Sequence, residues 1–161
     1  MHVRRARRGD YAAIGEVTVA AYAEFTQGRA DPYVAKLADA ETRDLEAELW
    51  VAVDPDDEVL GTVTVSPQGS PWREIAVEDE GEFRMLAVAP SARGRGIGLA
   101  LAQHCVDRFR EEGSPAVVLS SLVEMTAAHR LYERLGFARL PERDWSPLPG
   151  VDLIAFRKEL A

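Results

Sequence analysis

A glycine-rich turn between a predicted strand and a predicted helix is the feature from which a chemistry can be inferred most directly. The turn consists of Arg93, Gly94, Arg95, Gly96, Ile97 and Gly98. Backbone N–H groups at a helix N-terminus attract anions because the peptide dipoles are aligned there, and glycines let a phosphate approach them closely. The arginines can add charge-assisted hydrogen bonds. The turn predicts a phosphate or pyrophosphate site; the alternative is that the glycines only permit a tight turn against a sheet.

The spacing of the glycines separates this turn from two known phosphate-binding motifs. A Rossmann turn needs G-x-G-x-x-G, but the required third glycine is Leu99 or Leu101, depending on the glycine counted first. A nucleotide P-loop needs Gly-Lys-Ser or Gly-Lys-Thr, and the chain has neither. The pattern that remains is Arg-x-x-Gly-x-Gly, formed by Arg93, Gly96 and Gly98.

Two sequence blocks resemble those of a known family. The pattern Arg-x-x-Gly-x-Gly, after a strand that ends at residues 86–90, resembles the acetyl-CoA signature of the GNAT superfamily of N-acyltransferases. Residues 131–137 resemble the family's second block, in which a helical tyrosine, here Tyr132, faces the thiol of coenzyme A. The blocks occur in the family's order. The resemblance covers essentially the whole chain, and it is specific for the fold and the cofactor but not for the substrate.

The resemblance implies an acyltransferase with acetyl-CoA as cosubstrate. It implies that the backbone of Leu86, Ala87 and Val88 pairs with the pantetheine amides like an added strand, while residues 93–98 hold the pyrophosphate. The implied reaction moves an acetyl group to a primary amine of a small molecule or peptide by direct attack in a ternary complex. Met125 departs from the pattern, because the family often has an asparagine there that hydrogen-bonds the cofactor. A neighbouring hydroxyl or the backbone could replace that contact, and the methionine could pack on pantetheine or fill the core.

Two side chains are candidates for the proton transfers of this reaction. An alkyl amine has a pKa of about 10.4, so a base or a water chain must remove a proton before attack. Glu82, at the start of the central strand where the family often has a glutamate acting through water, is the candidate base; an ordinary strand-edge carboxylate is the alternative. Tyr132 could donate a proton to the departing thiolate or be a core tyrosine. A backbone N–H near Ala87 or Val88 could stabilise the oxyanion.

Three function classes follow: an amine N-acetyltransferase, a non-catalytic acyl-CoA-binding regulatory module, and a different nucleotide-phosphate binder. Tyr132 and Glu82 beside an intact turn favour catalysis, and the failed motif counts disfavour the third class. Covalent catalysis by Cys105 is disfavoured because this residue lies on the apolar stripe of its helix, which predicts a buried structural thiol. The acceptor itself is not predicted, but five aromatic side chains could line its pocket: Tyr22, Phe25, Tyr33, Trp72 and Trp145.

The elements that must position these residues follow from hydrophobic periodicity and turn residues. Helices are predicted at 11–22 behind Asp10 as N-cap, at 32–49, at 97–112 and at 128–135. Strands are predicted near the N-terminus with solvated arginines, at 50–53 and 59–65 as a hairpin, and at 82–90, 116–120, 137–139 and 151–157. Residues 66–81 are predicted to form a surface connection anchored by Trp72.

These elements predict a single domain over residues 1–161. The resemblance implies the fold class α/β with a mixed α+β sheet. In this GNAT fold a twisted sheet of six or seven strands carries helices on both faces, and the central parallel strands splay apart to admit the pantetheine arm. The predicted order of strands and helices agrees with that fold.

Composition limits the partners that we expect. The net charge of −8, from 19 basic and 27 acidic residues, argues against nucleic acid and anionic membranes. No apolar run is long enough to span a bilayer, and the three histidines lack metal-ligand spacing, so neither a membrane span nor a metal site is expected. The single cysteine, Cys105, excludes an internal disulfide and suits a reducing cytoplasm. The oligomeric state is open, with a homodimer among the alternatives.

Overall fold

The computed structural model describes residues 1–26, 28 and 31–160. Its strands form one mixed sheet in the order β1-β2-β3-β4-β5-β8-β6, and β7 pairs with β8. The strands are β1 (His2–Arg5), β2 (Glu48–Val53), β3 (Val59–Val65), β4 (Gly81–Val88), β5 (Ala116–Leu122), β6 (Ala138–Arg139), β7 (Trp145–Leu148) and β8 (Val151–Glu159). The α-helices are α1 (Tyr11–Ala21), α2 (Pro32–Ala38), α3 (Ala40–Glu46), α4 (Ile97–Glu112) and α5 (Thr126–Arg134). The short 3-10 turns within the described residues are η1 (Arg8–Asp10), η2 (Ala23–Phe25), η4 (Pro90–Ala92) and η5 (Pro141–Arg143).

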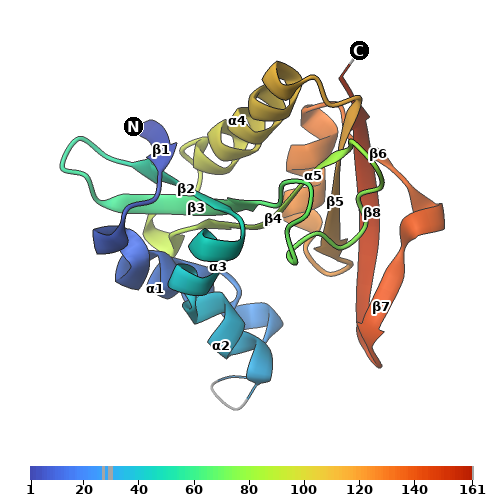
Figure 1. Ribbon diagram of the computed structural model, residues 1–161. Coiled ribbons are helices and arrows are strands. Elements are labelled where there is room, and N and C mark those ends of the chain that lie inside the picture. Colours follow the sequence, from blue (N-terminus) through green and yellow to red (C-terminus); the bar gives the residue numbers. More distant parts are fainter. Residues whose placement is uncertain (27, 29–30, 161) are drawn as a thin grey trace.

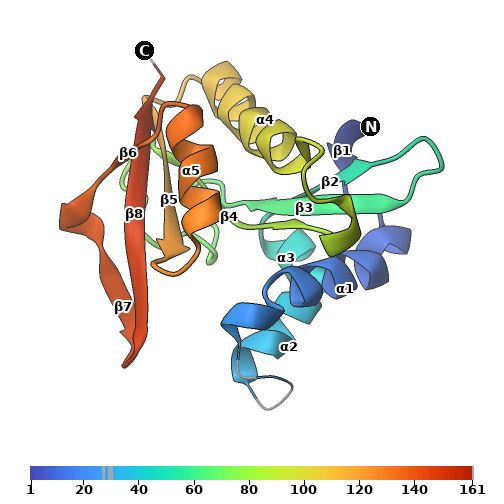
Figure 2. The ribbon, with the colours of Figure 1, turned by 180° about the vertical axis from the view of Figure 1, so that it is seen from behind.

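The helices cover both faces of the sheet. Helices α1, α2 and α3 lie on one side of the strands β1–β4, and α4 lies on the other (Figure 1). Seen from behind, α5 lies in front of β5 and β8 (Figure 2). The largest apolar cluster lies between α4, α5 and the sheet, and it includes Leu101, Cys105 and Phe109 of α4, as their four-residue spacing predicts.

The two central strands diverge soon after they pair. Strands β4 and β5 are parallel, and they pair only through Gly81 with Val117 and Glu82 with Val118. Beyond that point a bulge changes the course of β4, because Met85 and Leu86 oppose the single residue Val63 of β3. Met85 has the left-handed φ of 52° that such a bulge permits. Figure 1 shows β4 and β5 turning away from each other.

The region around α2 and the end of the sheet differ from prediction. The single helix predicted for 32–49 is wrong: α2 and α3 are separate, because Asp39 ends the first and caps the second by accepting a hydrogen bond from the Thr42 N–H at 3.1 Å. The sheet has eight strands instead of the expected six or seven. The unpredicted strand is β7, whose proline at 147 is unusual within a strand and is tolerated at this outer position.

The N-terminal strand has one solvated arginine, Arg5, as predicted, but its Arg4 forms a partly buried ion pair. The Arg4 guanidinium lies 2.8 Å from the Asp10 carboxylate, and both side chains are only 11% exposed. The same carboxylate accepts a hydrogen bond from the Arg7 N–H at 2.7 Å, so it does not cap α1 as predicted. Hydrogen bonding to Arg4 holds the pKa of Asp10 below its usual range. None of the described helices is long and apolar enough to cross a membrane.

Candidate active site

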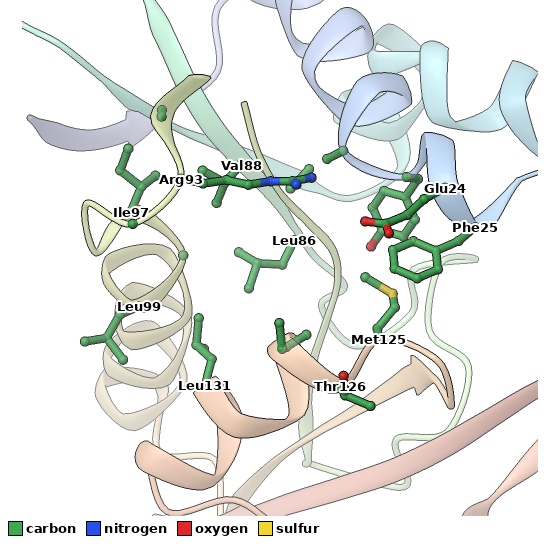
Figure 3. Close-up of a pocket in the computed structure, with 18 of the residues that line it drawn as sticks. Glu24, Phe25, Leu86, Val88, Arg93, Ile97, Leu99, Met125, Thr126 and Leu131 are labelled. Carbon is green, nitrogen blue, oxygen red and sulfur yellow. The ribbon is translucent and has the colours of Figure 1, made fainter. Parts of the chain in front are cut away.

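Two cavities meet where β4 and β5 diverge. The first cavity, of about 740 Å³, is bounded by β4, the glycine-rich turn and the start of α5 (Figure 3). The second cavity, of about 440 Å³, is bounded by η2, α2, β4, β5 and the β7–β8 hairpin. Four residues line both cavities: Tyr22, Phe25, Leu86 and Met125. The two cavities therefore adjoin at these four residues, which we call the junction.

The glycine-rich turn forms one end of the first cavity. Gly94 and Gly96 have φ values of 80° and 77°, which favour glycine, and a Cβ atom at either position would meet nothing within 4 Å. Their backbone therefore borders open space at the N-terminus of the 16-residue helix α4. Gly98 serves packing, because a Cβ there would lie 3.0 Å from Leu131 and 3.6 Å from Val88. This geometry suits an anion at the start of the helix.

The arginines of the turn differ in position. Arg93 lines the first cavity, and its side chain extends along the cavity toward the side occupied by Glu24 and Phe25 (Figure 3). Arg95 is exposed and is not among the residues that line either cavity. The other predicted cofactor-binding residues all line the first cavity: Leu86, Ala87, Val88, Gly94, Gly96, Ile97 and Gly98.

The edge of β4 beyond its bulge faces the first cavity. Ala87 and Val88 pair on one side with Thr62 and Gly61 of β3. On the other side, the described pairing with β5 has ended at Glu82. A strand with one free edge can add a further extended segment through its main-chain hydrogen bonds. The edge of β4 is therefore open to an extended segment that carries amide groups.

Tyr132 lies at the inner wall of the second cavity. It is 6% exposed and comes from α5, where it packs edge-on against Phe83 and Phe137 with ring centroids 6.0 and 5.9 Å away. Burial raises the pKa of its phenol, so the hydroxyl keeps its proton over the neutral range. The ring of Tyr132 packs in the core, as one of the two sequence interpretations predicts. Because the residue also lines the second cavity, its protonated hydroxyl is available as a proton donor there.

Glu82 is held inside the protein. It is 0% exposed, and its carboxylate accepts hydrogen bonds from the backbone N–H groups of Glu74 at 2.9 Å, Ile75 at 3.0 Å and Ala76 at 2.8 Å. Burial raises the pKa of Glu82, while these three hydrogen bonds oppose the rise. Glu82 lines neither cavity. Its carboxylate therefore fixes the segment 74–76, and the sequence-based prediction did not include this contact.

Glu74 and Arg84 are the charged pair that the second cavity contains and that the sequence interpretation missed. The Arg84 Nη1 lies 3.4 Å from the Glu74 Oε2, and both residues line the cavity. Burial raises the pKa of Glu74, the nearby Arg84 lowers it, and Glu82 raises it further. A charged residue in the otherwise apolar stretch 83–88 was the available signal for Arg84. No local pattern marked Glu74, because residues 66–81 have no sustained period.

The remaining candidates are distributed around the site. Tyr22 and Phe25 line both cavities and Tyr33 lines the second. Trp72 and Trp145 line neither cavity: Trp145 donates a hydrogen bond to the Ser120 hydroxyl at 3.2 Å. Cys105 is fully buried, which confirms the predicted structural thiol. The residues that the structure describes include no group of three or more His, Cys, Asp or Glu side chains placed to hold a metal ion.

Comparisons with known proteins agree with this geometry. The sequence profile of the Acetyltransferase (GNAT) family matches residues 14–137. A mycothiol acetyltransferase from Renibacterium salmoninarum is 32% identical over 107 residues, which cover 62% of this chain and 31% of that protein. This chain thus spans well under half of that relative's length.

Solved structures share the fold over nearly the whole chain. An acetyltransferase of the GNAT family from Staphylococcus aureus superposes with a TM-score of 0.76 at 15% identity and covers 99% of both chains. The Salmonella typhimurium protein yncA, solved with its cofactor acetyl-CoA, superposes with a TM-score of 0.69 at 24% identity, covering 99% of this chain and 94% of that one. At these identities the likeness establishes the fold.

Proposed function

Because the chain belongs to the GNAT acetyltransferase family, we propose that it transfers the acetyl group of acetyl-CoA to a primary amine by direct attack in a ternary complex. The observation that carries this proposal is the junction of the two cavities at Tyr22, Phe25, Leu86 and Met125. Two substrates that enter from opposite sides can react only where their cavities meet. Holding them there converts a bimolecular reaction into an effectively unimolecular one.

The residues of the first cavity fit acetyl-CoA. The open backbone at Gly94 and Gly96, with Arg93 beside it, suits the pyrophosphate. The free edge of β4 from Leu86 to Val88 suits the pantetheine amides, and it leads toward the junction. Met125 contributes a thioether at the junction, which supports apolar packing there in place of an asparagine hydrogen bond. Bound acetyl-CoA supplies the thioester that the amine attacks.

The second cavity suits the amine acceptor and the proton transfers. We assign the donation of a proton to the leaving thiolate to Tyr132, whose raised pKa keeps it protonated. For removal of the amine proton we assign Glu74, directly or through water, because the other carboxylate of the cavity wall, Asp31, caps α2. Burial raises the pKa of Glu74 toward neutrality, which favours proton acceptance. Glu82, the base predicted from sequence, acts in this proposal as the positioning residue for Glu74.

The test is an assay of free-thiol release with acetyl-CoA and a panel of amines that includes amino acids, amino acid amides, polyamines, aminoglycosides and peptides. Thiol release that depends on an amine supports the acetyltransferase. Acetyl-CoA binding without release with any amine would contradict it and favour the non-catalytic acyl-CoA-binding module. Thermal stabilisation by acetyl-CoA provides the binding measurement independently of turnover.

A further inference from the structure

The wall of the second cavity contains an arginine, Arg84, whose described contacts leave some of its N–H donors unused. The Arg84 side chain is 15% exposed and comes from β4. A guanidinium has five N–H donors in a planar fork that matches a carboxylate bidentately. The polar contacts of Arg84 are one with the Glu74 carboxylate at 3.4 Å and one with the Tyr33 hydroxyl at 3.3 Å. Both distances are long for charge-assisted hydrogen bonds, so the fork retains donor capacity.

An aromatic ring fixes the orientation of this cation. The Arg84 guanidinium carbon lies 5.2 Å from the centroid of the Trp72 ring. The Trp72 indole N–H in turn donates a hydrogen bond to the Glu46 carboxylate at 3.0 Å. A guanidinium held against a ring in this way keeps its position without using its N–H donors. Arg84 is therefore preorganised to bind an anionic group in the cavity.

A second guanidinium beneath the cavity adds positive charge. Arg43 of α3 is 0% exposed, and its Nη1 donates to the carbonyl oxygens of Lys36 and Leu37, not to a carboxylate. Its Nε and Nη2 atoms have no partner among the described residues. The charge of Arg43 acts on Arg84 and Tyr33, and the carboxylate of Asp39 partly compensates for it. A buried charge of this kind is costly unless something compensates for it.

Charged side chains of both signs surround the cavity. The cations are Lys36 and Arg84 in the wall and Arg43 beneath it. The carboxylates of the wall are Glu74 and Asp31, and Asp31 also caps α2 by accepting from the Tyr33 N–H at 2.9 Å. With the buried Glu82, whose charge acts on Arg84, three carboxylates face the three cations, so an anion is attracted by the fork of Arg84 and not by a net charge of the site. A purely cationic acceptor such as a polyamine would meet repulsion from Arg84.

The remaining wall of the cavity is largely apolar, with the hydroxyl groups of Thr26, Ser120 and Ser121 as exceptions. Its apolar residues include Leu119, Leu122 and Leu153. The volume of the cavity, about 440 Å³, is that of a small-molecule site. From the fork of Arg84 and this largely apolar wall, we propose that the acceptor is a free amino acid or a related small amino carboxylate, whose carboxylate binds Arg84. This inference rests on the proposed acetyl transfer to an amine. It names the acceptor class of the same site.

Binding of a carboxylate to Arg84 also affects the neighbouring acid. The acceptor carboxylate would share Arg84 with Glu74, which weakens the attraction that lowers the pKa of Glu74. A second negative charge nearby raises that pKa further. The acceptor would thus bring Glu74 closer to the range in which it accepts a proton from an amine. An analogue in which a carboxamide replaces the carboxylate lacks this effect.

The experiment compares matched amines and matched variants. Each common amino acid, its amide and its decarboxylated amine are assayed for free-thiol release and for thermal stabilisation of the protein in the presence of coenzyme A. We expect at least one amino acid to exceed its amide by about 10- to 100-fold in kcat/KM, as charge-assisted hydrogen bonds predict. Arg84→Gln should remove that advantage and leave stabilisation by acetyl-CoA intact. Arg84→Lys, which keeps the charge but not the fork, should remove part of it.

The control variant is Arg110→Gln, because Arg110 lies on α4 with its side chain 48% exposed and outside both cavities. It should behave like the wild type. The inference would be overturned if the amide or the decarboxylated amine matched every amino acid in both thiol release and thermal stabilisation. It would also be overturned if Arg84→Gln lowered kcat/KM equally for an amino acid and for its amide. Thiol release with polyamines but with no amino acid would leave acetyl transfer standing and refute only the acceptor class. If none of the tested amines supports thiol release, the proposed function itself is refuted.

Discussion

The carboxylate of Glu82 accepts a hydrogen bond from the backbone N–H of Glu74 at 2.9 Å. A fully buried acid on β4 thus fixes the position of an acid that borders the second cavity. Glu82 alone is the candidate base predicted from the sequence, whereas we now propose Glu74 as the base and Glu82 as the residue that positions it. Glu82 supplies a rigid anchor through three backbone contacts, and Glu74 presents its carboxylate to the site.

Replacing Glu74 should impair proton removal. We expect Glu74→Gln to lower kcat/KM by about 10²- to 10⁴-fold, the usual range for general acid–base catalysis. In the wild type, activity should rise with pH as Glu74 loses its proton, and because its pKa is raised this rise should lie above the range of an ordinary glutamate. A pH–rate profile measures both effects. The exposed Glu78→Gln serves as the control, and an unchanged acidic limb in Glu74→Gln would exclude Glu74 as the base.

Replacing Glu82 should act through structure. In Glu82→Gln one carboxylate oxygen becomes an NH₂ group, which cannot accept a hydrogen bond from the N–H groups of residues 74–76. We expect the free energy of unfolding to fall by about 1–3 kcal/mol, the cost of unsatisfied buried groups. Hydrogen exchange should accelerate at the amides that lose their acceptor: Glu74 if Oε2 is replaced, or Ile75 and Ala76 if Oε1 is replaced. Unaltered exchange together with wild-type stability would show that the anchor contributes nothing.

The glycine turn should be sensitive to a side chain that carries negative charge. Gly96→Glu adds both bulk and charge where the backbone borders open space, so we expect acetyl-CoA to lose its stabilising effect. For the wild type that effect is about 2.7 kcal/mol at a hundred times the dissociation constant. Gly113→Glu is a matched control at the other end of α4, since Gly113 has φ 85° and equally open surroundings. Full stabilisation in both variants would put the phosphate site elsewhere.

The parts of this site that sequence could predict are those set by local rules. Gly94 and Gly96 mark left-handed turns, and the four-residue spacing from Leu101 to Phe109 marks the buried face of α4. The cavity face of β4 was not predictable, because the bulge at Met85 breaks the alternation that assigns side chains to faces. Glu74 was not predictable either, since a long-range contact with Glu82 places it.

The hydroxyl of Tyr132 should matter for turnover more than for binding. Tyr132→Phe keeps the ring that packs against Phe83 and Phe137, so acetyl-CoA should bind as to the wild type. We expect kcat to fall by about 10²- to 10⁴-fold, because the leaving thiolate loses its proton donor. Tyr11→Phe is the control, as the Tyr11 hydroxyl donates to Asp44 away from both cavities. If Tyr132→Phe turns over as fast as the wild type while chemistry is rate-limiting, water and not Tyr132 protonates the thiolate.

The most direct test of the account follows the acetyl group itself. The protein is mixed with acetyl-CoA labelled in its acetyl group and with the amine panel, and the label is located by mass spectrometry while free thiol is measured. We predict that label appears on the nitrogen of an amine in an amount equal to the thiol released, and that none appears on the buried Cys105. Bound acetyl-CoA whose label reaches no amine, or reaches an amine only after forming an acetyl-protein species, would contradict direct transfer at the junction of the two cavities.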